Sequence, residues 1–125
     1  MTSTLLDSRV ASALNRMFTE ADAQMPMLGE LMGRDGVPEE ASAQQRADAL
    51  SDFYLPITPE AGRLLYTLVR ASRPATVVEF GMSLGISAIH LASAVRDNGE
   101  GRVVTTELNA QKVKMATANF ADAGF

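Results

Sequence analysis

An apolar strand, a glycine-punctuated loop and a helix start follow one another in residues 77–87, which read V-V-E-F-G-M-S-L-G-I-S. Glycine lets backbone N–H groups approach a ligand closely, and the first turn of a helix favours a negative group. A second apolar strand, residues 103–106, leads into Glu107, which is placed to meet a ribose. The pattern predicts a nucleotide-type pocket where two neighbouring strands end.

The first 52 residues are predicted to form an N-terminal helical segment. Apolar residues at helical spacing predict a helix over residues 5–23, which Pro26 kinks or ends, with a short helical piece to Met32. Residues 33–36 (G-R-D-G) read as a turn, and Pro38-Glu39-Glu40 suits the first turn of a helix that reaches Leu50. Four of the seven methionines gather in this part of the chain and predict packing in the core or at an oligomer interface: Met17, Met25, Met27 and Met32.

Residues 53–125 are predicted to form the first part of an α/β domain. Thr58-Pro59-Glu60 starts a helix whose apolar stripe is Ala61, Leu64, Leu65, Leu68 and Val69. Then come a strand over 75–80, a helix over 86–95, a turn over 97–99 and a strand over 102–107. Asn109 is expected to cap a last helix that ends at Gly124, with four residues on its inner face: Val113, Ala116, Thr117 and Phe120.

Strand–helix–strand units of this kind pair in parallel through a right-handed crossover. Parallel strands are normally covered on both faces, and open sheets usually carry about four to six strands. Two strands are few by that measure. We therefore expect a fold truncated after the second strand and its following helix, or packing supplied by another chain.

Composition excludes several classes of function. The formal charge of −4 and the absence of a Lys/Arg cluster argue against nucleic-acid binding, and the chain has no Cys for disulfides or thiolate zinc. No apolar run reaches the about 20 residues of a membrane span, and residues 1–7 lack the basic start of a signal peptide. We expect a cytoplasmic protein that contacts neither membrane nor nucleic acid.

The motif E-F-G-M-S-L-G-I-S, residues 79–87, resembles the first motif of class I S-adenosylmethionine-dependent methyltransferases. It is most similar to that of the small-molecule O-methyltransferases of the catechol and caffeoyl-CoA type, whose loops read E-x-G-x-x-x-G-x-S. Three flanking segments are also similar to these enzymes: residues 57–65, 101–109 and 119–125. The resemblance spans residues 53–125 and implies a Rossmann-like fold.

The resemblance also implies a role for each residue of the pocket. The donor's carboxylate would lie among N–H groups at the helix start, with the Ser87 hydroxyl as a further donor. Glu79 would hold the donor's ammonium, and Glu107, 22 positions after Gly85, would accept hydrogen bonds from the ribose hydroxyls. Met82 and Ser83 would line the wall. The predicted cofactor-binding residues are thus Glu79, Gly81, Met82, Ser83, Gly85, Ser87 and Glu107.

The implied reaction moves the methyl group of S-adenosylmethionine to a hydroxyl of a small molecule. In the catechol and caffeoyl-CoA group a divalent cation such as Mg²⁺ orients the acceptor, and its ligands and the catalytic base lie after the third strand. No catalytic residue and no metal ligand is therefore assigned in this chain. Such enzymes commonly pair through their N-terminal helices, which implies a homodimer.

Three other interpretations remain open. A NAD site would need G-x-G-x-x-G, whereas Ser83 stands where the second glycine belongs. The run G-M-S-L-G also matches the G-x-S-x-G elbow of hydrolases, but His90, expected as a surface or half-buried helix residue, would lie about 10 Å along the helix from Ser83. Thirdly, the chain could be an inactive, truncated dimeric scaffold.

Tyr54 and Tyr66 are expected to be packing residues with hydrated hydroxyls.

Overall fold

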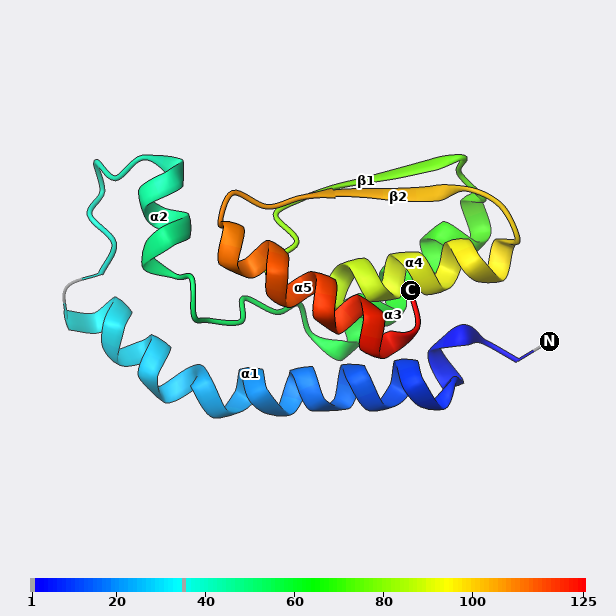
Figure 1. The fold of residues 1–125 in the computed structure, drawn as a ribbon, viewed down its shortest axis with the longest axis horizontal. Coiled ribbons are helices and arrows are strands. Elements are labelled where there is room, and N and C mark those ends of the chain that lie inside the picture. Colours follow the sequence, from blue (N-terminus) through cyan, green and yellow to red (C-terminus); the bar gives the residue numbers. More distant parts are fainter. Residues whose placement is uncertain (1, 35) are drawn as a thin grey trace.

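A computed structural model describes residues 2–34 and 36–125, an α/β arrangement of two parallel strands and five α-helices (Figure 1). The strands follow the sequence prediction to within one residue at each end. In chain order the elements are the 3₁₀ turn Thr4–Leu6, α1 Ser8–Arg34, α2 Ala43–Ala49, α3 Pro59–Ser72, β1 Thr76–Phe80, α4 Ile86–Asn98, β2 Arg102–Thr106 and α5 Ala110–Ala123.

Within the described residues, helices lie on only one face of the sheet (Figure 1). β1 and β2 pair in parallel, with Thr76 opposite Arg102 and Phe80 opposite Thr106. Val77 and Val103 are half-buried against α4, and α3, α4 and α5 form a layer between the sheet and α1. On the other face, which no described helix covers, Phe80 is 86% exposed and Val78 and Val104 are also exposed. This arrangement is compatible with part of a Rossmann-like fold.

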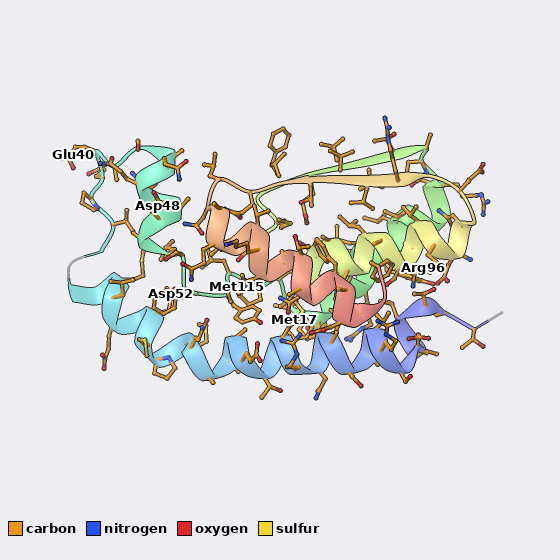
Figure 2. The ribbon with its side chains drawn as sticks, in the orientation of Figure 1. Met17, Glu40, Asp48, Asp52, Arg96 and Met115 are labelled. Carbon is orange, nitrogen blue, oxygen red and sulfur yellow. The ribbon has the colours of Figure 1, made fainter. Side chains whose placement is uncertain are left out.

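The largest apolar cluster lies between α1 and the helices above it. Met17 is completely buried there, at the centre of the molecule between α1 and α5 (Figure 2), together with Val10, Leu84 and Ile89. Met25, Met27 and Met32 are exposed instead, so the core-packing interpretation holds for Met17 alone. The core therefore anchors α4 and the loop that precedes it.

The first helix is longer than predicted. α1 continues through Pro26 to Arg34, and its axis changes direction in its light-blue part (Figure 1). Proline removes one backbone hydrogen bond, but it does not end the helix here. The predicted turn over 33–36 is wrong at Gly33 and Arg34, which are helical; Asp35 lies outside the described residues, and Gly36, at φ +52°, donates its N–H to Leu31 O at 3.0 Å.

The second helix begins later than Pro38. α2 starts after Ser42, whose hydroxyl accepts the Gln45 N–H while the Gln45 side chain accepts the Ser42 N–H. This reciprocal capping box satisfies two helix-start donors, which Pro38-Glu39-Glu40 does not do. The N-terminal boundary predicted from proline and acidic residues is therefore wrong by about one turn.

The structure confirms some of the other predicted helix ends and buried faces and contradicts others. Thr58 caps α3, Asn109 caps α5 and Gly124 ends it, as predicted. The residue ranges differ at α4, which continues through Asn98 to a left-handed Gly99. The two predicted faces are correct in part. On α3, Val69 is buried and Leu65 is half-buried as predicted, whereas Leu64 and Leu68 are exposed. On α5, Ala116 is buried and Phe120 is half-buried as predicted, but Val113 and Thr117 are exposed, and the buried face also includes Lys112, Asn119 and Ala123.

Candidate functional site

The loop between β1 and α4 is bent by three residues with positive φ: Gly81 at +79°, Ser83 at +51° and Gly85 at +101°. The N–H groups of Gly81 and Met82 both donate to Thr106 O, at 3.1 and 2.9 Å. These bonds tie the loop to the end of β2. The glycine loop predicted from the sequence thus lies at the carboxyl ends of both strands, the edge where parallel α/β sheets bind ligands.

Gly85 is required here for two reasons. Its φ of +101° is a conformation that residues with a side chain rarely adopt, and a Cβ atom would lie 2.6 Å from the Phe120 ring of α5. Gly81 differs, because a Cβ atom there would meet nothing within 4 Å. The space beside Gly81 is open, as close approach of a ligand to the loop backbone requires.

Glu107 is half-buried and is held by two backbone N–H groups. Ser83 N donates to its Oε2 at 3.0 Å, and Asn109 N donates to its Oε1 at 3.0 Å. An ionised carboxylate offers about four lone-pair sites, so about two remain. The structure therefore fixes the plane of this carboxylate beside the glycine loop and leaves each oxygen able to accept another hydrogen bond.

Glu79 and Ser87 flank the loop on its two sides. Glu79 is half-buried in β1, and its Oε2 accepts a hydrogen bond from the Thr105 hydroxyl of β2 at 2.5 Å. Ser87 lies in the first turn of α4, whose N-cap residue, Gly85, provides no side-chain cap. The N–H groups of this first turn have no capping oxygen from Gly85, so they can donate to a negative group.

A small hollow of about 10 Å³, room for about one water molecule, lies between the glycine loop and the connector before α3. Sites that enclose a whole drug-sized ligand measure about 300–1,000 Å³, so a ligand at the loop would lie mostly outside this hollow. Tyr54 of this connector donates from its hydroxyl to Glu20 at 2.5 Å, and burial, with the Glu20 carboxylate, raises its pKa to about 12. The lining comprises Tyr54, Leu55, Pro56, Ile57, Met82, Ser83, Leu84, Ile86 and Ser87.

Lys112 and Asn109 belong to the site, although the sequence analysis assigned Lys112 no role and gave Asn109 only a capping one. Lys112 is 3% exposed, and its Nζ donates to the Ser83 hydroxyl at 3.2 Å. Burial lowers the pKa of Lys112, and the negative charge of Glu107 opposes that shift. A count of apolar residues at helical spacing does not detect a buried lysine, so the available signal was the position of Lys112 five residues after Glu107.

The helix α2 and the connector after it are attached to the start of α5 by side-chain hydrogen bonds. The Asn109 amide donates to Asp48 at 2.8 Å, and the Gln111 amide donates to Asp52 at 2.8 Å. Figure 2 shows Asp48 on α2 and Asp52 below it, on the side where α5 begins. The N-terminal segment thus supports the start of α5 beside the site.

His90 is buried, not at the surface or half-buried as predicted. Its Nδ1 lies 2.8 Å from Ile86 O, and its ring packs where a Cβ on Gly62 of α3 would approach to 2.5 Å. Burial lowers the pKa of His90. Ser83 Oγ instead accepts hydrogen bonds from Leu55 N–H and Lys112 Nζ. These contacts engage both residues in packing and loop structure and do not form a nucleophile–histidine pair.

Residues 2–34 and 36–125 contain neither a candidate metal site nor a membrane-spanning helix. Within these ranges no three His, Asp or Glu side chains come together to hold a metal ion. Nor is any helix in the described part of the chain long and apolar enough to cross a membrane.

The tyrosine hydroxyls that were expected to be hydrated form hydrogen bonds with protein groups: Tyr54 with Glu20, and Tyr66 with Ser3 and Asp97.

No family model matches the chain. A protein of Mycolicibacterium smegmatis named "Putative O-methyltransferase" is 33% identical over 84 residues, which cover 67% of this chain and 38% of the relative. "Probable O-methyltransferase Rv1220c" of Mycobacterium tuberculosis is 34% identical over 68 residues, 54% of this chain and 30% of the relative. A Mycobacterium bovis protein matches to the same extent. These similarities support a relationship to methyltransferases. The chain spans only about 30% to 38% of the length of these curated relatives.

Proposed function

We propose that this chain carries part of a binding site for S-adenosylmethionine and belongs to an enzyme that methylates a hydroxyl group of a small molecule. The observation that carries the proposal is the Glu107 carboxylate, held by the Ser83 and Asn109 N–H groups beside a left-handed glycine loop. The similarity to proteins named O-methyltransferases supports the reaction class. The class I assignment and the likeness to the catechol and caffeoyl-CoA group belong to this proposal.

Each end of the donor has a matching group in the proposed site. The remaining lone pairs of Glu107 would accept hydrogen bonds from the ribose hydroxyls. The uncapped first turn of α4, with Ser87, would receive the carboxylate of the donor, and Glu79 would face its ammonium. Gly81 leaves room for the donor against the backbone, while Met82 and Ser83 line the adjacent hollow.

When bound, S-adenosylmethionine would supply a methyl group to the acceptor oxygen: the C–S bond would break as the C–O bond forms, S-adenosylhomocysteine would leave, and the hydroxyl proton would pass to the catalytic base. Positioning donor and acceptor in line contributes much of the catalysis of such a displacement. The residues of this chain would bind and orient the donor. We propose that the catalytic base, and the ligands of any Mg²⁺ that orients the acceptor, lie outside these residues.

The test is calorimetric titration of the chain with S-adenosylhomocysteine, with NAD as the competing ligand class. We expect the first to bind and NAD not to, because the Ser83 side chain stands where a dinucleotide loop has glycine. Glu107→Ala should weaken binding about 10- to 100-fold, the scale of a lost hydrogen bond to a charged group. Glu30→Ala, an exposed change on α1, is the matched control.

Lack of binding to a wild-type chain that circular dichroism shows to be folded would contradict the proposal. Binding of NAD alone would favour the dinucleotide interpretation instead. Release of nitrophenol from a nitrophenyl ester, lost in Ser83→Ala, would favour the hydrolase.

A homodimer, with or without catalysis, remains a second proposal because of the exposed methionines of α1. Met25, Met27 and Met32 are each more than half exposed, and flexible thioethers suit an adaptable contact surface. The mass of the chain in solution, measured by sedimentation, tests it. A monomer at all concentrations would refute the dimer, and a dimer that binds no donor would support the scaffold.

A further inference from the structure

Ser83 of the glycine loop forms a closed ring of hydrogen bonds with Glu107, Asn109 and Lys112. Two sides of the ring are the backbone N–H groups of Ser83 and Asn109, which donate to the two oxygens of Glu107 at 3.0 Å each. The other two come from Lys112, whose N–H donates to Asn109 Oδ1 at 3.0 Å and whose Nζ donates to Ser83 Oγ at 3.2 Å. The ring joins the loop after β1, the loop after β2 and the first turn of α5.

Lys112 is the unexpected member of this ring. Its position on α5 faces the core, with Ala116, Asn119 and Ala123 on the same buried face. Burying an ammonium group is costly unless it is paired and hydrogen-bonded. Its hydrogen bond to Ser83 and the nearby charge of Glu107 supply that compensation. An apolar side chain would fill the same place at lower cost, so packing alone does not account for a lysine here.

Ser83 is the member under backbone strain. It has φ +51°, in the left-handed region that a residue with a side chain seldom occupies outside turns. Such a conformation persists only where the surroundings impose it. Two donors hold the Ser83 hydroxyl in place, the Leu55 N–H at 3.3 Å and the Lys112 ammonium at 3.2 Å. In this conformation the Ser83 N–H points at Glu107.

We propose that Lys112 is a positioning residue of the donor site, which holds Ser83 in its left-handed conformation and, through the Ser83 N–H, orients the Glu107 carboxylate toward the ribose hydroxyls. The inference rests on the proposed function, because it assigns those hydroxyls to Glu107. Lys112 acts through Ser83 and Glu107 and not by contact with the ribose. Its removal should therefore impair recognition of the ribose more than binding of the rest of the donor.

The experiment compares S-adenosylhomocysteine with its 2′-deoxyribose analogue as ligands of the wild-type chain and of Lys112→Met. We expect the wild type to prefer the ribose form about tenfold, the scale of one hydrogen bond to a carboxylate. Lys112→Met, which keeps the bulk of the side chain without its charge, should reduce that preference to about twofold or less. Lys114→Met makes the same change at an exposed position of α5 and should keep the full preference.

The ratio of the two dissociation constants separates positioning from a general structural role. A loop that merely loosens would weaken both ligands alike and leave the ratio unchanged. Ser83→Ala provides a second route, because it removes the acceptor of the Lys112 bond while leaving the lysine in place. It too should lower the ratio to about twofold, and the double variant should lower it no further.

Two contrary results have different meanings. If the wild type prefers the ribose form and both Lys112→Met and Ser83→Ala keep that preference, the inference is overturned while the donor site stands. If the folded wild-type chain binds neither ligand, the donor site is refuted and the inference with it. Should Lys112→Met fail to fold, as judged by circular dichroism, Ser83→Ala alone decides.

Discussion

Two helices beside the candidate site, α4 and α2, are held in place by different forces. Nine of the thirteen residues of α4 are buried, among them Ile89 and Leu91. None of the seven residues of α2 is buried; its capping box stabilises its own first turn, and the Asp48–Asn109 hydrogen bond attaches it to the start of α5. Burial fixes α4, and a few polar contacts fix α2.

The difference shows how the site is built. The glycine loop leads into α4, so the buried core holds the loop and its N–H groups in place. The Glu107 side of the site is attached to α2 through Asn109, so that side depends on surface hydrogen bonds, which contribute little each to net stability. We therefore expect the glycine-loop side of the site to be rigid and the Glu107 side to be more easily displaced.

The largest expected difference in stability is between a Leu→Ala substitution in α4 and the same substitution at the end of α2. Leu91→Ala in α4 should lower the free energy of unfolding by about 2–5 kcal/mol, because it leaves a cavity in a buried cluster. Leu50→Ala at the end of α2, where the leucine is half-buried, should cost about 1 kcal/mol or less. Urea denaturation followed by circular dichroism measures both, and equal losses would remove the contrast.

A second substitution sharpens the account of how α4 is packed. In Gly62→Ala the new Cβ would lie 2.5 Å from the buried His90 ring, and such overpacking typically costs about 1–3 kcal/mol. Gly29→Ala meets nothing within 4 Å on α1 and should stabilise the chain by up to about 1 kcal/mol. Thermal unfolding of the pair tests this, and a neutral Gly62→Ala would mean that α3 and α4 pack loosely.

The third effect should be confined to α2. Ser42→Ala removes the capping hydroxyl and should cost about 1 kcal/mol, about a fivefold loss of protection from hydrogen exchange. The amides of α4 should keep their protection. Exchange that accelerates equally in both helices would show that α2 and the core unfold as one unit.

The smallest effect is one of pH and concerns α4. Burial lowers the pKa of His90, so the folded state binds a proton less readily than the unfolded state. The stability contributed by neutral His90 is full above its ordinary pKa of about 6.5 and is lost as pH falls through the folded value. Stability should therefore fall less steeply between pH 7 and pH 5 in His90→Gln than in the wild type. Parallel curves would contradict this.

Several helix ends and both strands could be predicted from the sequence because the local signals for each of them agreed. Thr58-Pro59 starts α3, and α5 begins after Asn109 and ends at Gly124. The two strands lie where the apolar runs predicted them. The glycine loop was equally plain, and it lies beside Glu107 as its pattern indicated. Short-range chemistry decides each of these features, so no tertiary information was needed.

The wrong predictions concern positions where tertiary packing, or a second local sequence signal, determines the structure. Ser42 and Gln45 carried a capping-box pattern, but the preceding Pro38 offered a rival start. The buried face of α5 includes Lys112 and Asn119, whose amide donates to Leu84 O, and a count of apolar residues cannot find polar groups satisfied in the core. His90 is buried because Gly62 leaves room for its ring, a contact between residues 28 positions apart.

The most direct test of the donor site is residue-specific NMR of the ¹⁵N-labelled chain during titration with S-adenosylhomocysteine. The account predicts that the largest amide shifts fall on residues 81–87 and 107–109, with those of the exposed part of α1 unchanged. Shifts confined to α1 and α2, or no shifts at saturating ligand in the folded chain, would contradict a donor site at the ends of β1 and β2.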